Sequence, residues 1–208
     1  MRENPSFALT DPEEVRELVR RESWMALVSA TSAHGLVVSH YPVVLDEAAD
    51  GIVLLGHVGR PDDLLHELGS HEVVAIVQGP HGYISPGWYD PAPAVPTWNF
   101  TVAHLYGTPQ LLTREQNLAA LDAMVTHFER HSPQPRPLLT PAEQAAYAER
   151  LERGTVGFRL PVERFVAKRK LSQNKPAETV RRVLAGLEGD GPFANPELAA
   201  DLKRVHGL

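Results

Sequence analysis

The sequence predicts an α+β protein in which a small β-barrel is decorated by helices. Three observations support this fold class: several short apolar segments have the character of strands, one amphipathic helix precedes them, and two helical regions come late in the chain. We expect a single domain over residues 1–208. Within it we expect an N-terminal helix over 8–22, a helical insertion over 114–153 and a helical tail over 177–208.

The expected helices carry start signals and apolar stripes. At the first helix, Thr10 or Asp11 can cap the free backbone N–H groups, and Pro12 suits the first turn. Its apolar stripe consists of Val15, Leu18 and Val19. Similar spacing predicts helices over 114–130 and 141–153, on either side of a proline-rich link. The tail is expected to hold two more helices, over 177–187 and 196–205.

Short segments rich in β-branched and apolar residues predict the strands. They cover residues 25–30, 36–38, 41–45, 52–56, 72–78, 97–112 and 155–170. Two of the connections are hairpin-like turns, at 32–35 and 46–51. The segment over 79–96 is expected to be a long loop, dense in proline, glycine and aromatic residues. Long structured loops in compact domains are usually functional, so this loop is a candidate for ligand contact.

The composition is that of a soluble globular protein. The 208 residues are 43% hydrophobic and 22% charged. No apolar run approaches the roughly 20 residues that span a bilayer, and the N-terminus lacks the apolar core of a signal peptide. We therefore expect a cytoplasmic protein. The net charge of -6 argues against a general nucleic-acid binder.

Metal chemistry in this chain would depend on histidine. The sequence has no cysteine, which excludes disulfides, thiolate nucleophiles, Fe–S clusters and thiolate-ligated haem. Ten histidines are many for this length. Imidazole is therefore the remaining soft-to-borderline metal ligand.

A short run of cations and amides, Lys168–Lys175, follows an apolar segment over 156–162. Lysine meets phosphate or carboxylate as a point charge, while Ser172, Gln173 and Asn174 add directional hydrogen bonds. A strand that ends in such a run can present fixed donors to an anionic ligand. The alternative is a solvated basic turn without a ligand.

Two histidine motifs lie at the ends of predicted strands. In Ser39-His40-Tyr41-Pro42, the serine and the imidazole could face a ligand or bond the backbone at a turn. In Gly56-His57-Val58-Gly59-Arg60, the glycines let a flat ligand approach the backbone, and His57 could ligate iron or contact a ring. Arg60, close to the start of a predicted helix, could hold a carboxylate or phosphate. The alternative for either histidine is a structural hydrogen bond.

Aromatic residues gather in the long loop and in the strand after it. Tyr83 and Trp98 offer stacking surface with polar tips. In an extended strand, one face would carry Thr97, Asn99 and Thr101, and the other Trp98, Phe100 and Val102. We expect the polar face to meet a ligand and the apolar face to join the core. Alternatively, the aromatic loop packs at a dimer seam.

Taken in order, these motifs resemble the PaiB-type family, usually described as FMN-binding negative transcriptional regulators with a split β-barrel fold. The resemblance covers nearly all of residues 5–187 and rests on segments 39–42, 56–60, 79–89, 95–107 and 168–174. It implies an FMN-binding-type split β-barrel decorated with helices, and a homodimer that holds its cofactor between subunits. The chain departs from the usual family pattern at Arg2, over 58–62 and in the loop 90–94, which is short and lacks basic residues.

The resemblance implies two functions from different classes, because the family also contains haem-dependent piperazate synthases. The first is a piperazate synthase-like enzyme with haem b, favoured because histidine is abundant and no thiolate competes. It would form a nitrogen–nitrogen bond by dehydrative cyclisation of N5-hydroxy-L-ornithine, a small amino-acid substrate. The alternative is an FMN-binding PaiB-type transcriptional regulator without established catalysis. A third interpretation is a structural dimeric barrel whose motifs serve only folding.

Each interpretation assigns roles to residues of this chain. With haem, His57 ligates the metal, with His40 as the second choice, and the catalytic residues are Lys170, Arg60 and Thr97. The wider cofactor-binding set consists of His57, His40, Ser39, Arg60, Tyr83, Trp98, Lys168, Lys170, Ser172, Gln173 and Asn174. With FMN, the phosphate would be held by Lys168, Lys170, Ser172 and Arg60, and the isoalloxazine ring would be lined by Trp98 or Tyr83. Neither interpretation involves a membrane, and nucleic acid is not an expected partner.

Overall fold

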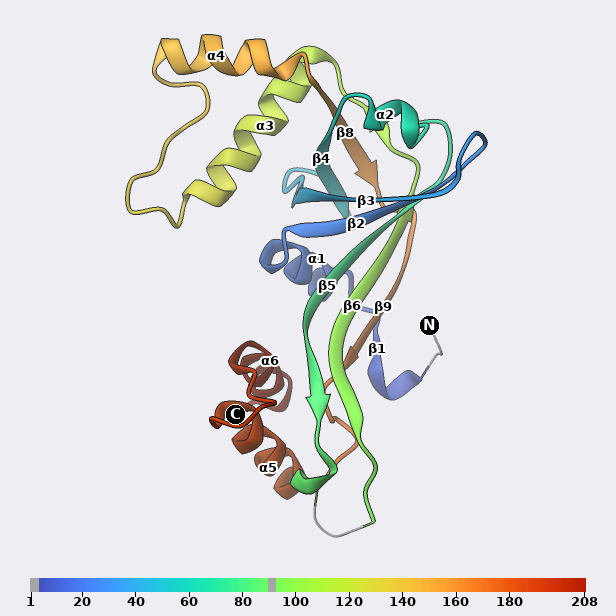
Figure 1. The fold of residues 1–208 in the computed structure, drawn as a ribbon, viewed down its shortest axis with the longest axis vertical. Helices are drawn as coiled ribbons and strands as arrows, with labels where there is room; N and C mark the ends of the chain where they lie inside the picture. The colour runs from blue at the N-terminus through green and yellow to red at the C-terminus, as the bar shows by residue number, and fades with distance from the viewer. Residues whose placement is uncertain (1–3, 90–92) are drawn as a thin grey trace. The chain divides into compact units, whose positions relative to one another are not determined.

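The structure, a computed structural model, describes residues 4–89 and 93–208 of the chain. In this part of the chain, nine strands form one antiparallel sheet in the order β1-β9-β6-β5-β2-β3-β4-β8-β7, accompanied by six α-helices (Figure 1). Internal contacts divide the chain into two compact units. Unit 1 consists of Met1–Asp11, Gln78–Ala103 and Val166–Leu208, and unit 2 of Pro12–Val77 and His104–Phe165. The expectation of a single domain over 1–208 stays a prediction.

The strands are distributed over both units. Unit 2 contains β2 (Trp24–Thr31), β3 (Gly35–Leu45), β4 (Val53–Gly59), β7 (Gln110–Leu111) and β8 (Thr155–Pro161). Three strands continue from one unit into the other: β5 (Val73–Ile84), β6 (Thr97–Gly107) and β9 (Arg164–Lys170). The short β1 (Ala8–Leu9) pairs with β9 in unit 1.

One face of the sheet in unit 2 forms its core. In the antiparallel register of β3, β4 and β8, Val43 lies opposite Gly56, and Gly56 lies opposite Phe158. Successive side chains of a strand point to opposite faces, so every second residue of β4 and β8 belongs to this face. Its buried side chains include Leu54, Val58, Val156, Phe158 and Leu160. The packing at position 56 leaves no room for a side chain, because a Cβ atom there would lie 2.6 Å from Cζ of Phe158.

Gly56→Ala is expected to lower the free energy of unfolding by about 1–3 kcal/mol, because the added methyl group overlaps an enclosed ring. The ring of Phe158 is fully buried, so it can move only by displacing its neighbours in the core. Gly59→Ala, at the end of the same strand, is the matched control, because a Cβ atom there meets nothing within 4 Å. Denaturant unfolding of both variants checks the prediction, and equal stability would contradict the packing argument.

Four helices belong to unit 2. α1 (Pro12–Arg21) buries the expected stripe of Val15, Leu18 and Val19. α2 (Asp62–Leu65) is a single short turn. α3 (Arg114–Glu129) begins with a capping box, in which Thr113 and Gln116 satisfy each other's backbone N–H groups, and α4 (Ala142–Glu152) follows it. α3 packs against both β4 and β8, so it covers the sheet where the histidine motif of β4 lies.

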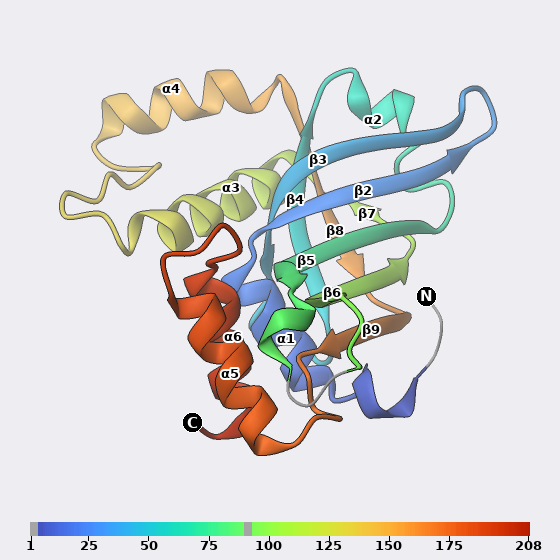
Figure 2. The same cartoon turned by 60° about the horizontal axis from the view of Figure 1, so that its bottom comes forward.

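The end of the chain forms the core of unit 1. α5 (Ala177–Glu188) and α6 (Pro196–His206) lie side by side in both views (Figure 1, Figure 2). Their buried cluster consists of Ile84, Leu171, Val180, Val183, Leu187, Leu198, Ala199 and Leu202. Two short 3-10 helices, η1 (Pro5–Phe7) and η2 (Pro86–Trp88), complete the unit. None of the helices in the described ranges is long and apolar enough to cross a membrane.

Two strands are longer than the sequence predicted. The strands expected over 36–38 and 41–45 are one strand, β3, so the Ser39-His40 motif lies inside a strand and the predicted junction is wrong. The reason is pairing, because β3 keeps its register with β2 through this motif. β5 likewise continues to Ile84, so the first part of the loop expected over 79–96 is a strand.

Two other boundaries also differ from the prediction. The strand expected over 155–170 is divided into β8 and β9. The helix expected over 8–22 begins only at Pro12, because the residues of β1 pair with β9 instead. The expectations about Arg2 and about the middle of the loop 90–94 lie outside the described residues.

The two faces of β6 are reversed relative to the prediction. Asn99 and Thr101, expected to face a ligand, are almost fully buried, whereas Trp98 is 53% exposed. Burial of the polar residues is possible because the Asn99 amide donates a hydrogen bond of 3.0 Å to Ser172 Oγ. The aromatic face of β6 is therefore the one that can meet a ligand or a partner.

Candidate functional site

His57 lies in the middle of β4, directly opposite Gly157 of β8. The ring is half-buried, and its Nδ1 atom is enclosed without a hydrogen-bond partner in the described chain. Burial lowers the pKa of this imidazole below its usual range, because a charged ring would lose its hydration. The ring is thus held neutral near pH 7, and neutral imidazole is the form that ligates a metal.

His57 belongs to the outer face of the sheet, the one that α3 covers. Residues directly opposite each other in an antiparallel pair share a face, so His57 and Gly157 point the same way. The side-chain position that Gly157 leaves empty is occupied by Asn117 of α3, whose Oδ1 lies 2.3 Å from where a Cβ atom would be. The imidazole is therefore placed between a rigid strand and this helix.

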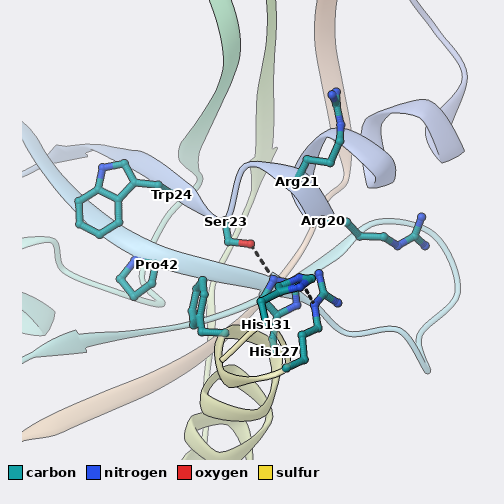
Figure 3. Close-up of a pocket in the computed structure, with 9 residues that line it drawn as sticks. Arg20, Arg21, Ser23, Trp24, Pro42, His127 and His131 are labelled. Carbon is teal, nitrogen blue, oxygen red and sulfur yellow. Dashed lines mark hydrogen bonds between the residues drawn. The ribbon is translucent and has the colours of Figure 1, made fainter. Parts of the chain in front are cut away.

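A pocket of about 680 Å³ opens in the same unit, a size typical of small-molecule sites (Figure 3). Its lining comes from α1, β2, β3 and the C-terminal end of α3: Arg20, Arg21, Ser23, Trp24, Pro42, His127, Phe128, Arg130 and His131. The indole of Trp24 is 58% exposed. It stacks on His40, with ring centroids 6.3 Å apart and planes 16° from parallel. The pocket thus offers a flat aromatic wall.

The rim of this pocket is cationic. Arg20 is already bound by Glu47, with hydrogen bonds of 2.8 and 3.0 Å, and by Glu13. His127 shares a hydrogen bond of 3.0 Å with Ser23, as Figure 3 shows, and Arg130 donates one of 2.9 Å to His131. Burial, followed by the neighbouring Arg130 and His131, lowers the pKa of His127. An anionic group would be attracted to this rim.

The pocket wall continues toward His57. Val43 lies opposite Gly56, so the adjoining residues Pro42 and His57 are neighbours in β3 and β4. Val43 is fully buried in the core, so Pro42 and His57 point to the outer face. The arrangement can therefore hold a flat anionic ligand against an apolar wall, with a neutral imidazole beside it.

Ser39 is tied to a buried histidine. His66 has no exposed surface, and its Nε2 atom lies 2.9 Å from Ser39 Oγ while its Nδ1 atom lies 2.8 Å from Ser29 Oγ. Tyr41 packs edge-on against the same ring and donates a 2.8 Å hydrogen bond to Asp62. Burial raises the pKa of Tyr41 to about 12, so its hydroxyl stays protonated. Ser39 is therefore fixed in orientation.

Stability is expected to fall with acid because of His66. Burial, as the main cause, lowers the pKa of its ring, and the unfolded chain returns that pKa to about 6.5. Above about pH 6.5 the ring is neutral in both states, and its full contribution to the free energy of unfolding is present. That contribution is lost as the pH falls from the unfolded pKa toward the lower folded pKa. Each such proton adds a slope of up to about 1.4 kcal/mol per pH unit. His66→Gln should flatten the unfolding free energy between pH 7 and 5, whereas exposed His34→Gln should not.

Arg60 does not present a free charge. Its guanidinium is 55% exposed and forms an ion pair of 2.9 Å with Asp63. Together with Arg114, Asn117 and Glu152 it lines a smaller cavity of about 270 Å³. Its catalytic and cofactor-binding roles stay predictions, and any anion there would compete with a carboxylate already in place.

The other predicted residues belong to unit 1, where Lys170 and Thr97 meet. The ammonium of Lys170 donates a short hydrogen bond to Thr97 Oγ1. Burial, with Lys168 and Lys175 nearby, lowers the pKa of Lys170. Lys168 lies over the ring of Phe100, 5.8 Å from its centroid. Lysine with a lowered pKa and a fixed hydroxyl partner can give up and regain a proton.

At the end of the basic run, the side chains of Ser172 and Gln173 already form hydrogen bonds within the protein. Ser172, in a left-handed conformation with φ of 62°, accepts the Asn99 amide hydrogen bond already described. The side chain of Gln173 accepts from Leu171 N–H at 2.7 Å and donates to the Arg169 carbonyl at 2.6 Å. Asn174 is exposed. Gln173 therefore uses both ends of its amide within the turn, whereas Ser172 accepts from Asn99 of β6.

The predicted aromatic residues of unit 1 form a cluster. Trp98 stacks on His81, with centroids 6.4 Å apart, and Tyr83 meets its edge. Tyr83 also packs against Phe193, 4.7 Å between centroids. Trp98 and His81 line a cavity of about 280 Å³ with Gln78, Phe100 and Val102. Contact of Tyr83 and Trp98 with a cofactor stays a prediction.

The sequence interpretation missed the α3 side of the site. Asn117, His127 and Phe128 were assigned only to a helix, and Trp24, directly before the strand expected over 25–30, was given no role. A signal existed in His127 and His131, two imidazoles at helical spacing beside Arg130. Their meeting with Trp24 depends on the packing of α3, which spacing alone does not reveal.

A split barrel with a neutral histidine on its outer face and an aromatic, cationic pocket beside it defines a cofactor-binding class of protein. Residues 1–164 match the family model described as "Putative FMN-binding domain". Over 186 residues the chain is 30% identical to protease synthase and sporulation protein PAI 2 of Bacillus subtilis, covering 88% of this chain and 87% of the relative. The chain belongs to this PaiB-type, FMN-binding-domain family, as its motifs predicted.

Solved structures confirm the fold class. The FAD and haem binding protein from Mycobacterium smegmatis has a TM-score of 0.59 and 16% identity, over 86% of this chain and 80% of its own. The flavocytochrome Anf3 from Azotobacter vinelandii also has a TM-score of 0.59, with 14% identity, over 78% of this chain and 69% of its own. At these identities the likeness concerns the split-barrel fold alone.

Proposed function

We propose that the protein binds haem b through His57 and acts as a piperazate synthase-like enzyme. The observation that carries the proposal is the neutral, half-buried imidazole of His57, with an enclosed Nδ1 atom, beside a pocket of aromatic and cationic residues. A haem ring needs one axial ligand, an apolar wall and cations for its carboxylates. The fold offers a precedent, since one similar structure is described as an FAD and haem binding protein and another as a flavocytochrome.

The residues of unit 2 fit a haem group. His57 would ligate the iron. Trp24 and Pro42 would form an apolar wall for the porphyrin, and the rim with Arg21 and Arg130 would attract its propionates. When bound, the iron supplies a Lewis acid that withdraws electrons from a coordinated nitrogen.

FMN fits the described residues less well. Its phosphate needs several free donors at one place. Gln173 uses its amide within the turn, Ser172 is almost fully buried beside Asn99, and Arg60 is paired with Asp63. Of the cations in the run, Lys170 already donates to a hydroxyl, that of Thr97. This difference favours haem over the flavin suggested by the family description.

The proposed reaction is a ring closure with loss of water. The α-amine of N5-hydroxy-L-ornithine attacks N5, the N–O bond breaks, and the hydroxyl leaves as water after it takes a proton. The amine loses protons in turn, so no external oxidant or reductant is consumed. We assign the proton donor role to Lys170, whose lowered pKa suits it, and the orienting role to Thr97. Positioning supplies the rest, because attack needs the two nitrogens within about 3–3.5 Å.

The test is a mass assay on the purified protein. Haem-loaded protein incubated with N5-hydroxy-L-ornithine should give a product lighter by one water. The protein without haem should give none. If the loaded protein leaves the substrate unchanged, the synthase assignment is wrong even though haem binds. Yellow flavin absorbance in the protein as isolated would instead support FMN.

We also propose a homodimer that uses the outer face of β2 and β3. Leu36 is 77% exposed and Val38 56% exposed, and both lie on the face of Trp24, since opposing pairs share a face. Exposed apolar patches of this kind mark interaction sites. Val38→Glu should halve the mass measured by light scattering, whereas Leu111→Glu, equally apolar but on β7, should leave it unchanged. A wild-type monomer would overturn this proposal.

A further inference from the structure

We infer that Asn117 is the positioning residue for the His57 ring: its carboxamide oxygen accepts the Nδ1–H hydrogen bond and so leaves Nε2 for the cofactor. This inference deepens the proposed haem function and rests on it, because only a ligand ring requires a fixed orientation. Histidines that ligate metals almost always donate their other N–H group to such a partner.

The strand register brings the two side chains to one place. His57 and Gly157 are directly opposite, so a Cβ atom on residue 157 would lie about 4.5–5.5 Å from the Cβ atom of His57. Asn117 Oδ1 lies 2.3 Å from that Cβ position. The Nδ1 atom of His57 is two bonds from its own Cβ atom on the same face. These distances leave room for a rotated imidazole to bring Nδ1 within hydrogen-bond reach of Oδ1, a contact that the present ring orientation does not make.

The two atoms are chemically complementary, and both are enclosed. Within the described chain, His57 Nδ1 and Asn117 Oδ1 are each buried and each lack a hydrogen-bond partner. One can donate and the other can only accept. Buried polar atoms left unpaired are rare, and two that face the same spot from opposing elements point to a shared bond.

The orientation of the Asn117 amide is fixed by its nitrogen. Nδ2 donates to Glu152 Oε1 at 2.9 Å and to Thr155 Oγ1 at 3.0 Å, two acceptors that only the NH₂ group can satisfy. Glu152 is in turn held by Arg114 at 3.1 Å. Asn117 itself is only 2% exposed. The oxygen is thereby directed away from this network, toward Gly157.

Gly157 is the residue that admits this contact. A side chain at 157 would collide with three atoms of Asn117, at 2.3, 2.8 and 3.0 Å. Any larger residue would therefore push the carboxamide away from His57. Gly157 is therefore needed for the contact between Asn117 and His57. The sequence alone shows it only as a small residue within a strand.

The first test reads the tautomer of His57 in the protein without haem. With ¹⁵N-labelled histidine at pH 7.5, NMR should show the Nδ1–H tautomer in the wild type. Asn117→Ala should shift His57 toward the Nε2–H tautomer. Thr155→Val is the matched control, because it removes one bond of the same amide but keeps Oδ1, and it should retain the Nδ1–H form. An Nε2–H tautomer in the wild type would overturn the inference.

The second test measures haem affinity by titration. Asn117→Ala should weaken haem binding roughly 10–100-fold, the usual effect of losing the partner of a ligand histidine. Gly157→Ala, which displaces the carboxamide without removing it, should give a similar loss. Unchanged affinity in both variants would contradict the positioning role. If Asn117→Ala does not fold, the wild-type spectrum and Gly157→Ala decide. Since the tautomer is read without haem, failure of the contact and failure of the haem proposal are distinguishable.

Discussion

His57→Ala is expected to weaken haem binding by more than about 100-fold, because losing merely the partner of a ligand histidine already costs about 10–100-fold. The folded chain should tolerate the change. The substitution removes at most the Nδ1–H bond to Asn117 inferred above, and such a bond contributes about 0.5–1.5 kcal/mol net. We therefore expect the free energy of unfolding to fall by no more than about 1.5 kcal/mol. Loss of the Soret band on titration, together with only a small shift of the denaturant midpoint, checks both parts.

His34→Ala is the matched control for this experiment. His34 lies in the exposed turn between β2 and β3, and only its backbone N–H makes a hydrogen bond, to Thr31. It should bind haem as the wild type does. A Soret band of full strength in His57→Ala would contradict the assignment and direct attention to His40, beside Trp24, as the ligand. A large loss of stability would instead mark His57 as a structural residue.

The helices were predictable because their signals are local. The apolar stripe of α1 occupies consecutive turns, so neighbouring residues alone determine the result. The strands were less predictable, because pairing overrides local interruption. The polar residues Ser39 and His40 predicted a break between two strands, but β2 pairs with β3 through both residues. The same cause moved Ala8 and Leu9 from the expected helix into a strand.

The candidate site was predictable where one segment carries it. The Gly56-His57 motif indicated a histidine with room for a flat ligand, and the structure places its ring half-buried on an outer face. Asn117 was not predictable, since its role depends on a register between two strands and on a helix that crosses them. For Gln173 the sequence predicted a role in ligand binding that the structure does not favour. Its amide looked available, but local bonds to its own turn use it, and spacing does not reveal such bonds.

The family description and the geometry direct attention to different parts of the chain. A flavin interpretation depends on the basic run of unit 1, where Ser172 is almost fully buried and the Gln173 amide is bonded within its turn. A haem interpretation depends on His57 and the pocket of unit 2. Because Lys170 and Arg60 have roles in both interpretations, the substitutions that separate the two are those of His57 for haem and of Ser172 for the flavin.

Lys170→Met is expected to lower turnover by about 10²–10⁴-fold, the usual contribution of a positioned proton donor, while haem still binds. Methionine keeps much of the apolar stem of lysine but removes the ammonium that bonds Thr97. Lys203→Met is the control, since Lys203 lies in α6 and pairs with Glu188 rather than with Thr97. The measurement is the single-turnover rate of water loss from N5-hydroxy-L-ornithine, with the Soret band recorded in the same samples.

Two substitutions of Thr97 distinguish a chemical role of the Lys170–Thr97 pair from a packing role. Thr97→Ser keeps the hydroxyl that accepts from Lys170 and should retain most of the rate, whereas Thr97→Val keeps the shape and should lose it. If valine is tolerated and serine is not, the pair acts through packing, and Lys170 is not the proton donor. If Lys170→Met loses haem together with activity, its ammonium holds the cofactor, and the proton must come from elsewhere.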